Sequence, residues 1–512
     1  MESRPRRLTI SAPGALLALV LVHGALALWL SQTRLVDGDE GFYAAAAQLT
    51  AAGRTPYIDF FYPQAPLLPY LLAPACRLGL DSLALLRLVP VLLSTLMLWL
   101  WGAALLALLP ARPVAVVTAL AVLALNPHLL GWHATIKTYA AADLFATAAV
   151  AAAALARRRG QAGWTVAAGV AAGLATATRA MYAPLVPLVI AWPLLGRRAT
   201  ALTALGAGVG LSPALLLLAR DPGAFWFGNV GCHLVRWSPL RAAGVAPSTW
   251  QRLAAPLKVF GRTCGENPWL LLTLLGATAG AWLWWRRRHD PARPDENGDL
   301  TGLALAALGL LLVVSLLPDP VYAQYFTAPL APLAAPAMAV ALDAAGRRRP
   351  RTVAAAVGGA AVLLSGWTLF VRHAEQPVDP VWRLDAIETV AEGVRRHSAP
   401  NDVVLAFWPG YVFESGRRYL PGFENHFAVG LSDRLSAAQR ERHHIAGYER
   451  ITLALRERQP RLVIVGAWMS DLNQALSNAQ TKLVMDALLQ NYSVIEDYGD
   501  ALILAPRSAT AP

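Results

Sequence analysis

The sequence contains little charge and few cysteines. Only 15% of its 512 residues are charged, whereas ordinary soluble domains carry about 25%. Its three cysteines, Cys76, Cys232 and Cys264, have no paired spacing, which excludes a disulfide framework and a zinc site built on cysteine. A glycine-rich phosphate-binding loop is also missing from the sequence, so no motif indicates a nucleotide cofactor.

Hydrophobic residues, in contrast, make up 56% of the chain and occur in long blocks. Stretches such as Pro13–Leu30, Leu83–Leu109 and Thr301–Leu317 are long enough, or nearly so, to cross a hydrocarbon layer of about 30 Å. They are rich in Ala, Leu, Val and Gly, as packed transmembrane helices are. The sequence therefore predicts a polytopic α-helical protein in a lipid bilayer. The first block follows Arg4–Arg7 without a small-residue cleavage signature, which favours an uncleaved first helix.

Basic residues give the chain a net charge of +12 and stand in short groups between the apolar blocks. These groups, which we call the arginine knots, are Arg4–Arg7, Arg112, Arg157–Arg159, Arg197–Arg198, Arg286–Arg288 and Arg347–Arg351. A nucleic-acid-binding protein would present a continuous basic face instead, so we expect no nucleic-acid partner. Because short loops rich in Lys and Arg stay on the cytoplasmic side of a membrane, the knots predict the topology.

If every knot lies on the cytoplasmic side, the chain makes about eleven crossings. The expected helices cover about 12–31, 84–109, 113–131, 140–156, 163–178, 181–196 and 199–218, a segment ending near Arg286, and about 301–317, 326–344 and 352–371. Gln64–Leu80 is apolar enough to cross, but counting it would reverse every later knot. Since this segment is rich in proline, we expect an interfacial or re-entrant helix there.

This topology predicts two domains. Residues 1–372 form a transmembrane module, and its outer loop 32–83 carries the interfacial helices. Residues 373–512 form a small soluble α/β domain outside the membrane, with the C-terminus outside. The spacing of apolar residues from Leu384 to Val394 predicts a helix. Val403–Phe407 and Leu462–Val465 are typical of strands, and residues 434–458 and 470–490 favour helix.

Unusual polar residues collect on the outer side of this arrangement, where we therefore expect the chemistry, because ionisable groups near a membrane are costly. They are Asp37, Asp39, Glu40, Tyr57, Asp59, Tyr62, Gln64, His133, Lys137, Tyr139, Asp143, Arg179, Tyr182, Asn229, His233, Arg236, Asp319, Tyr322, Gln324 and Tyr325. The cytoplasmic loops offer mainly arginine.

Several of these residues also have a purely structural explanation. Asp39 and Glu40 can simply open an alanine-rich helix over about 39–52 that Gly53 ends, because acids in a first turn complement the helix dipole. The same stretch contains an Asp-x-Asp pattern, Asp37-Gly38-Asp39, by which many glycosyltransferases hold a metal ion. The pattern leaves a divalent cation open, although the metal itself stays unknown.

The remaining candidates have similar alternatives. Asp143 can pair with Lys137, which lies about two turns earlier. Arg179 can extend towards the interface as membrane arginines do, and His233 and Arg236 can anchor an aromatic loop there. Independent structural explanations do not account for the gathering of all these residues on one face.

The first outer loop resembles that of the GT-C membrane glycosyltransferases, and specifically glycosyltransferase family 39. The matching residues are Asp39-Glu40-Gly41-Phe42-Tyr43, an alanine-rich helix, Gly53, and then Tyr62-Pro63-Gln64-Ala65-Pro66-Leu67. The resemblance continues through Asp143-Leu144-Phe145, Thr178-Arg179 and Tyr322 to Pro329. It covers roughly residues 10–345, and the C-terminal domain resembles the accessory domains of some members only loosely.

The resemblance implies a transferase in the cytoplasmic membrane that moves a sugar from a polyprenyl-phosphate donor to a hydroxyl acceptor at the outer face, with inversion. It implies catalytic roles for Asp39 as base, for Glu40 in orienting acceptor or sugar, and for Asp143 as a second acidic contact. It implies that the other outer polar residues bind substrate; these are Tyr62, Gln64, His133, Lys137, Arg179, Tyr182, His233, Arg236, Tyr322 and Tyr325.

One position departs from the family. Family members commonly have lysine directly before the prolines, where it meets the donor phosphate, but this chain has Gln64-Ala65-Pro66. The phosphate contact must then come from Lys137, Arg179, His233 or Arg236. Two other functions stay open from sequence: a lipid or sugar transporter, which would place charges at mid-helix, and a non-catalytic assembly factor that presents its C-terminal domain.

Overall fold

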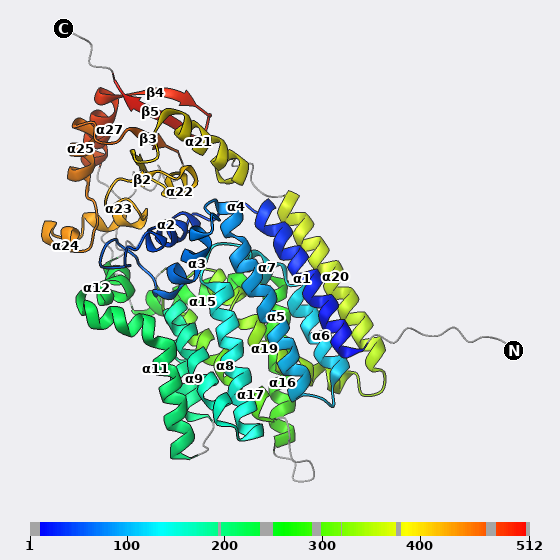
Figure 1. Cartoon of the computed structure of the whole chain (residues 1–512). Helices are drawn as coiled ribbons and strands as arrows, with labels where there is room; N and C mark the ends of the chain where they lie inside the picture. The colour runs from blue at the N-terminus through cyan, green and yellow to red at the C-terminus, as the bar shows by residue number, and fades with distance from the viewer. Residues whose placement is uncertain are drawn as a thin grey trace, which may run out of the picture.

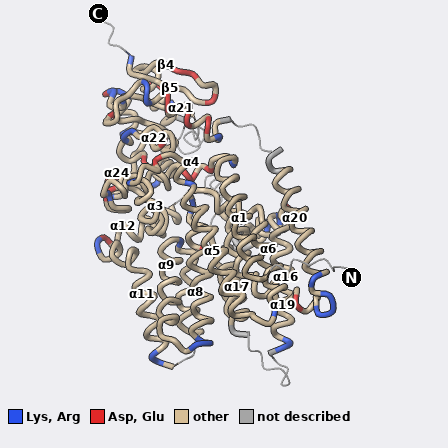
Figure 2. The backbone as a smooth tube through the Cα atoms, turned by 45° about the vertical axis from the view of Figure 1, so that its right-hand side comes forward, with Lys and Arg blue, Asp and Glu red and all other residues tan. Residues whose placement is uncertain are grey.

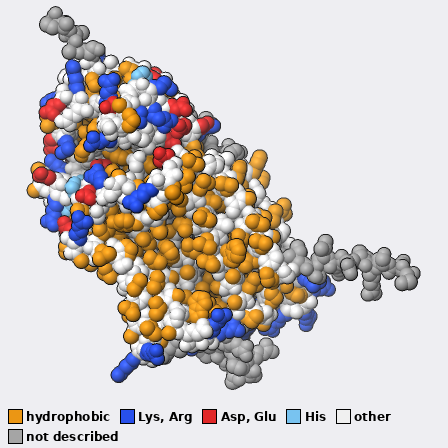
Figure 3. All heavy atoms as spheres, in the orientation of Figure 1, with side chains coloured by type: hydrophobic (Ala, Val, Ile, Leu, Met, Phe, Trp, Pro, Cys, Tyr) orange, Lys and Arg blue, Asp and Glu red, His pale blue; other side chains and the backbone are white. Residues whose placement is uncertain are grey.

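The chain forms a helical bundle with a mixed α/β region stacked on one end (Figure 1). The structure is a computed structural model that describes residues 11–192, 196–235, 249–288, 298–318, 320–374, 380–466 and 478–507. The surface of the bundle is covered with hydrophobic side chains, whereas charged side chains cover the α/β region (Figure 3). This division matches a membrane-embedded part and a water-exposed part.

Six helical segments among the described residues are long and apolar enough to cross a membrane. They are α1 (Ala12–Thr33), α4 with α5 (Leu83–Leu86, Leu88–Leu108), α8 (Tyr139–Arg159), α11 (Arg197–Arg220), α18 with α19 (Gln324–Thr327, Leu330–Ala345) and α20 (Pro350–Ala374). A seventh consists of α6 (Pro113–Ala124) and α7 (Pro127–His133), which are bent by 59°. The chain is therefore a multi-pass membrane protein, as predicted.

Four further helical segments lie at the positions of the other expected crossings. They are α9 (Ala162–Thr178), η1 with α10 (Ala180–Tyr182, Leu185–Ala191), α16 (Pro268–Arg288) and α17 (Gly298–Ser315). Every predicted crossing thus coincides with helix. In the described part of the chain, six or seven segments are long and apolar enough to be membrane spans. The count of eleven crossings stays a prediction.

Small residues let two helices of the bundle touch through their backbones. A Cβ atom added at Gly169 of α9 would lie 2.0 Å from the Thr203 carbonyl oxygen of α11, and one at Gly210 would lie 2.1 Å from that of Val170. Only glycine fits at such distances, and this close approach is a common way for transmembrane helices to associate.

The knots from Arg112 onwards lie at the end of the bundle farthest from the α/β region, where Figure 2 shows most of the basic residues of the bundle. The first knot, Arg4–Arg7, lies outside the described residues. Arg158 donates a 2.8 Å hydrogen bond to the Ala107 carbonyl. Arg112 and Arg287 both contact Asp343, at 3.3 and 3.6 Å. Knots that are far apart in sequence are therefore neighbours in space, which is the arrangement that the charge pattern predicts.

The first outer loop folds into two short helices, α2 (Glu40–Ala51) and α3 (Leu67–Arg77). As expected, α2 ends at Gly53, whose positive φ of 87° allows Gly53 and Arg54 to bond back to the Thr50 and Leu49 carbonyls. Helix α3 has 11 residues, too few for the roughly 20 that a crossing needs. The interfacial assignment of Gln64–Leu80 agrees with this length.

Five further helical segments occur between α11 and the sheet of the C-terminal region. They are α12 (Pro222–Trp226), a π-helical turn η2 (Phe227–Gly231), α13 (Cys232–Val235), α15 (Thr249–Glu266) and η3 (Pro380–Trp382).

The C-terminal region contains a five-stranded sheet in the order β2-β1-β3-β5-β4. Its strands are β1 (Val403–Ala406), β2 (Arg418–Tyr419), β3 (Leu462–Val465), β4 (Tyr492–Asp497) and β5 (Leu502–Pro506), with β1 parallel to β2 and β3 and with β5 antiparallel to β3 and β4. The helices are α21 (Leu384–His397), α22 (Gly410–Ser415), α23 (Phe427–Ser432), α24 (Ala437–Arg442), α25 (Tyr448–Arg456) and α27 (Asn478–Asn491).

These elements test the sequence expectations for this region. The two predicted strands and the helix from Leu384 are confirmed. The helix expected over 434–458 is wrong as one piece, because α24 and α25 are separated by a turn around His444, whose φ is 56°. The helix expected over 470–490 is confirmed from Asn478, and 470–477 lie outside the described residues.

The C-terminal region shares a hydrophobic core with the first outer loop. Val36 and Phe42 from the loop belong to the same buried cluster as Trp408, Phe413 and Ile464 from the α/β region. The Tyr419 hydroxyl also donates a 2.8 Å hydrogen bond to the Gln48 side chain of α2. Packing therefore joins the two parts that the sequence separates near residue 373.

Candidate active site

The acidic turn before α2 is built by its own hydrogen bonds. The Asp37 carboxylate accepts the Asp39 N–H at 3.0 Å, and the Glu40 carboxylate accepts the Asp37 N–H at 2.8 Å. Side chains of the turn thus satisfy two backbone donors just ahead of α2. The Asp39 side chain caps no backbone group of α2, so a helix-start role alone does not explain it.

Glu40 is completely buried and turned away from the outer face. Its carboxylate pairs with Arg87 through two contacts of 2.6 and 2.8 Å, and neither side chain has exposed surface. The second carboxylate oxygen also accepts the Ile136 N–H at 2.9 Å. Arg87 in turn donates to the Ser31 and Arg34 carbonyls. This pair ties the acidic turn to α1, to α5 and to the loop before α8.

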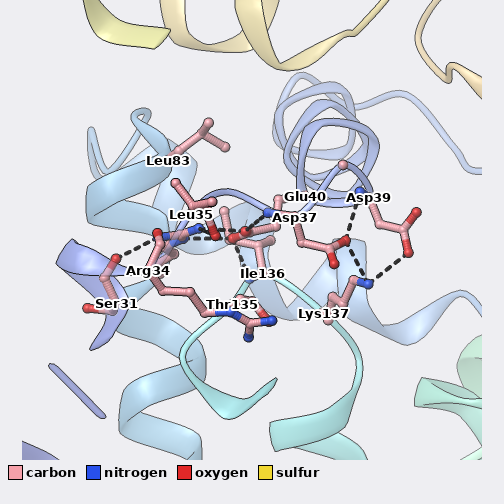
Figure 4. A network of polar contacts seen from close by, with 12 residues as sticks. Ser31, Arg34, Leu35, Asp37, Asp39, Glu40, Leu83, Thr135, Ile136 and Lys137 are labelled. Atoms are coloured by element: carbon pink, nitrogen blue, oxygen red, sulfur yellow. Dashed lines mark hydrogen bonds and ion pairs between the residues drawn. The ribbon is translucent and has the colours of Figure 1, made fainter. Parts of the chain in front are cut away.

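Lys137 lies between the two aspartates. Its ammonium nitrogen is 2.7 Å from Asp37 Oδ1 and 2.9 Å from Asp39 Oδ2 (Figure 4). The bend between α6 and α7 brings it there, since the Asn126 carboxamide caps α7 by accepting the His128 N–H at 3.0 Å and redirects the chain under the acidic turn. Lys137 therefore pairs with these residues and not, as the structural alternative held, with Asp143.

The electrostatics of this cluster follow from burial and close charges. Burial alone would raise the pKa of Asp37, but the Lys137 ammonium and the nearby Arg34 bring this pKa below its ordinary value. Burial would lower the pKa of Lys137, yet Asp39 and Asp37 outweigh it and raise that pKa. Both groups are therefore charged at neutral pH. The Asp39 side chain keeps 30% of its surface exposed, in contrast to the buried Lys137.

Arg179, at the end of α9, is a buried cation surrounded by tyrosines. Its guanidinium carbon lies 4.5 Å from the Tyr139 ring centre and 5.2 Å from that of Tyr325, and it donates to the Thr138 hydroxyl at 2.9 Å. Within the described part of the chain, no carboxylate lies within 4.0 Å of it. A buried charge without a counter-ion is costly, so this arrangement favours an anionic ligand.

Tyr43 connects this cation to the acidic turn. Burial raises the pKa of its hydroxyl, and Asp39 raises it further while Arg179 and Lys137 oppose the change. The Tyr43 hydroxyl thus lies within electrostatic reach of the exposed acid and of both cations. Arg179 also bonds to Thr138, the residue after Lys137, and Lys137 contacts Asp39, so the three charged groups are neighbours.

Asp143 belongs to a separate buried network. Its carboxylate contacts His133 Nε2 at 2.9 Å and accepts a hydrogen bond from the Tyr182 hydroxyl. His133 Nδ1 lies 2.9 Å from the Ser94 hydroxyl, which lies 2.7 Å from His23 Nε2. The network ends at the Ala124 carbonyl, 2.9 Å from His23 Nδ1.

The Ala124 carbonyl, together with a neutral His23, fixes the direction of this network. A carbonyl only accepts hydrogen bonds, so His23 Nδ1 must carry a proton. If His23 is neutral, Ser94 donates to its Nε2, and the Ser94 oxygen accepts a proton from His133 Nδ1. The contact between His133 Nε2 and Asp143 Oδ2 then needs one proton. Whichever of the two atoms carries it, the net charge of the pair is zero. A neutral pair is what burial favours.

The proline-rich segment is held by Tyr57, a buried residue whose φ of 68° is unusual for a side chain of its size. Its hydroxyl donates to the Gln64 carbonyl and accepts from the Asn229 amide at 3.1 Å. Tyr62 is buried, and its hydroxyl has no hydrogen-bond partner among the described residues. His233 is exposed and binds the Pro63 carbonyl at 3.0 Å.

The other expected residues are less central. Tyr322 is 37% exposed and meets Tyr325 edge to face, with ring centres 5.7 Å apart. Arg236 lies outside the described residues. Within the described part of the chain, no three His, Cys, Asp or Glu side chains are grouped as metal ligands would be, and the Lys137 ammonium lies between Asp37 and Asp39, the two acids of the Asp-x-Asp pattern.

Comparison with known proteins shows which fold the chain has. No protein-family model matches the chain, and no curated protein matches it. Solved structures do match it. Among them are ArnT from Cupriavidus metallidurans in the apo state, with a TM-score of 0.66 and 16% sequence identity, and the same protein bound to undecaprenyl phosphate, with a TM-score of 0.60 and 15% identity. Each match covers 97% of this chain and 98% of the other.

The chain has the fold of ArnT. The resemblance found over residues 10–345 is thus confirmed as a statement about the fold. The ArnT fold extends further than the sequence indicates, because the match also includes the C-terminal region, which the sequence relates to the family only loosely.

Sequence reasoning missed three residues of this site. Arg87 was detectable, because it is an arginine inside a block assigned to a membrane helix. Trp408 and His426, from the C-terminal region, were not, because nothing local indicates that they contact the acidic turn. In the ArnT-like arrangement Trp408 Nε1 donates to the Gly38 carbonyl at 2.8 Å, and His426 Nε2 lies 4.0 Å from Asp39 Oδ1.

Proposed function

We propose that this protein is a glycosyltransferase that moves a sugar from a polyprenyl-phosphate carrier to a hydroxyl acceptor. The observation that carries the proposal is Arg179, a buried cation without a carboxylate partner among the described residues, in the same site as the exposed carboxylate of Asp39. The ArnT fold, one structure of which holds undecaprenyl phosphate, supports this donor class.

Asp39 is the general base of this mechanism. Lys137 holds its Oδ2 at 2.9 Å, which fixes the carboxylate while Oδ1 stays available to a substrate hydroxyl. A general base must lie within hydrogen-bond reach of the proton that it takes. The acceptor oxygen then attacks the anomeric carbon as the bond to the phosphate breaks, the bonding electrons leave with the phosphate, and the proton passes to Asp39. One displacement of this kind inverts the anomeric centre.

Arg179 binds the donor phosphate. Its planar guanidinium matches the geometry of phosphate oxygens, and charge-assisted hydrogen bonds to phosphate are about twice as strong as neutral ones. The guanidinium carbon lies over the Tyr139 and Tyr325 rings. Two of its N–H groups donate to Thr138 and to the Met181 sulfur, and the phosphate binds the others. This assignment replaces the lysine that the family commonly has at the position of Gln64. Lys137 is less suited, since two aspartates already neutralise it.

Glu40 and Asp143 act as positioning residues in this proposal. Both carboxylate oxygens of Glu40 are used by Arg87, Asp37 and Ile136, which leaves no room for the substrate contact expected from the sequence. Asp143 is occupied by His133 and Tyr182. The first pair holds the acidic turn, and the second network holds the start of α8 beside Arg179.

The membrane orientation completes the proposal. The arginine knots face the cytoplasm, the acidic turn and the C-terminal region face outwards, and the chain crosses the cytoplasmic membrane about eleven times. The acceptor, a hydroxyl-bearing lipid, glycan or protein, therefore receives its sugar on the outer face.

The test uses the purified protein in lipid nanodiscs with radiolabelled undecaprenyl-phosphate sugars, supplied one at a time. A transferase releases the label from the carrier, onto an added envelope lipid extract or onto water. Asp39→Asn should lower that rate by at least about a hundredfold, whereas Asp385→Asn, at an exposed ion pair with Arg383, should not. If no donor loses its label, the protein is a transporter or an assembly factor and the proposal fails.

A further inference from the structure

The C-terminal region is clamped onto the acidic turn. The fully buried Trp408 donates to the Gly38 carbonyl at 2.8 Å, and its ring lies against Gly41, where an added Cβ would be 2.6 Å from the indole nitrogen. The Val36 N–H also donates to the Trp382 carbonyl at 2.7 Å. These contacts fix the position of the C-terminal region relative to Asp39, which lies between Gly38 and Gly41.

The loop before α23 carries a histidine to that acid. Its backbone is set by the Glu424 and Asn425 side chains, which accept the Gly422 and Phe427 N–H groups at 2.7 and 2.9 Å. The His426 side chain is only 3% exposed, and its Nε2 lies 4.0 Å from Asp39 Oδ1. Its ring centre is 4.1 Å from that of Phe427 and 5.7 Å from that of Phe42, so aromatic packing holds the imidazole in this orientation.

The separation of His426 and Asp39 is too long for a hydrogen bond, for which nitrogen and oxygen must lie within about 3.2 Å. It matches the span of two hydrogen bonds that share one oxygen atom, each about 2.8 Å long. The other Asp39 oxygen is already held by Lys137, so Oδ1 is the one that a substrate hydroxyl can reach.

The same loop offers a second polar group. Asn425 is buried, and its side-chain nitrogen has no hydrogen-bond partner among the described residues. A buried donor left without a partner costs about 1–3 kcal/mol. Such a cost is understandable if a ligand rich in hydroxyl groups supplies the missing acceptor.

We propose that the acceptor hydroxyl binds between Asp39 Oδ1 and His426 Nε2, so that the C-terminal region forms one side of the acceptor site. This inference rests on the proposed transferase function. The acceptor O–H donates to Asp39, and His426 Nε2–H donates to a lone pair of the same oxygen. These two hydrogen bonds orient the acceptor oxygen so that its remaining lone pair points towards the sugar. The region is therefore part of the catalytic unit and determines which hydroxyl compound is accepted.

The experiment measures the KM for donor and acceptor separately in nanodiscs, with octyl glucoside as a simple hydroxyl probe and the undecaprenyl-phosphate sugar that the wild type uses. His426→Leu should raise the KM for octyl glucoside by about tenfold or more, the loss expected when one hydrogen bond and its buried partner are removed. The KM for the donor should stay unchanged. His426→Gln, whose amide nitrogen can replace Nε2, should recover part of the loss.

The matched control is His397→Gln, because His397 lies in the same region but pairs with Glu496 at 2.7 Å on the surface. This variant should leave both KM values unchanged. The inference is overturned if the wild type transfers sugar and His426→Leu leaves the acceptor KM unchanged, or if it raises both KM values equally, as a general packing defect would. A wild type that releases no sugar from any donor overturns the proposed function as well, so the two failures are distinguishable.

Discussion

Glu40 and Arg87 form an ion pair in which Oε1 and Nη2 are 2.6 Å apart and neither side chain has exposed surface. The next residue towards the N-terminus, Asp39, points the other way and stays 30% exposed. Two adjacent acids therefore have opposite environments. The buried one anchors the turn, which leaves the exposed one available for chemistry.

This pair predicts a large loss of stability when one partner is removed. Glu40→Gln or Arg87→Leu leaves an uncompensated buried charge or unsatisfied donors, which costs about 3–5 kcal/mol, and the double variant should recover part of it. Thermal unfolding in detergent measures the difference. The control is Glu266→Gln at the exposed pair with Arg262, where less than about 1 kcal/mol is expected. Equal effects at the two sites would contradict the anchoring role.

A second prediction concerns the donor phosphate. Arg179→Lys keeps the positive charge but loses the planar fork and the stacking on Tyr139 and Tyr325, so undecaprenyl phosphate should bind about tenfold more weakly or worse. Isothermal titration of the protein in nanodiscs gives the dissociation constant. Arg77→Lys is the control, because Arg77 only donates to the Ala51 carbonyl near the surface. Unchanged binding by the Arg179 variant would move the phosphate elsewhere.

The fold was largely predictable because the physical signals were local. Apolar blocks and arginine knots report on the bilayer directly, and each expected crossing coincides with helix. The bend at Asn126 was not foreseen, because it depends on a side chain that caps α7. Strands β4 and β5 were missed as well, since much of β4 is exposed and lacks a buried apolar run.

The site was predictable in part. Asp39, Lys137 and Arg179 were named from their residue types and their outer position. Their partners were not, because the pairing of Glu40 with Arg87, or of Asp143 with His133, depends on how separate helices meet. His426 and Asp39 are far apart in the sequence, so no local pattern indicates that they lie close together. Sequence spacing suggested Asp143 with Lys137, but the start of α8 directs the two side chains to different partners.

A third prediction concerns pH. Burial, together with a hydrogen bond that the protonated Glu414 donates to the Glu388 carboxylate, raises the pKa of Glu414 from 4.5 to about 8. Glu414 Oε2 also accepts the Leu83 N–H at 2.7 Å, where the C-terminal region meets the bundle. The folded state therefore binds a proton that the unfolded chain releases, and stability falls as pH rises from about 4.5 to about 8. Above this range the contribution is gone.

The measurement compares thermal midpoints of the wild type and Glu414→Gln between pH 5 and pH 9. The difference between them should change across this range and level off above about pH 8. Asp385→Asn is the control of opposite sign, because the hydrogen bonds from Arg383, which does not titrate in this range, lower the pKa of Asp385. Its difference from wild type should be constant from pH 5 to pH 9, and a flat profile for Glu414→Gln would disprove the assignment.

The last prediction concerns the buried network from His23 to Asp143. With a neutral His23 bound to the Ala124 carbonyl, both His23 and His133 should carry a proton on Nδ1, and nitrogen NMR of histidine-labelled protein reports this directly. Ser94→Ala removes the hydroxyl between the two rings and leaves a buried donor and a buried acceptor unsatisfied, at about 1–3 kcal/mol each. Thr95→Val is the matched control, since the Thr95 hydroxyl only bonds back to the Val91 carbonyl at 2.8 Å. A His133 Nδ1 without a proton would show that the network does not have this direction. A Ser94 variant as stable as the Thr95 variant would show that the hydroxyl does not join the two rings.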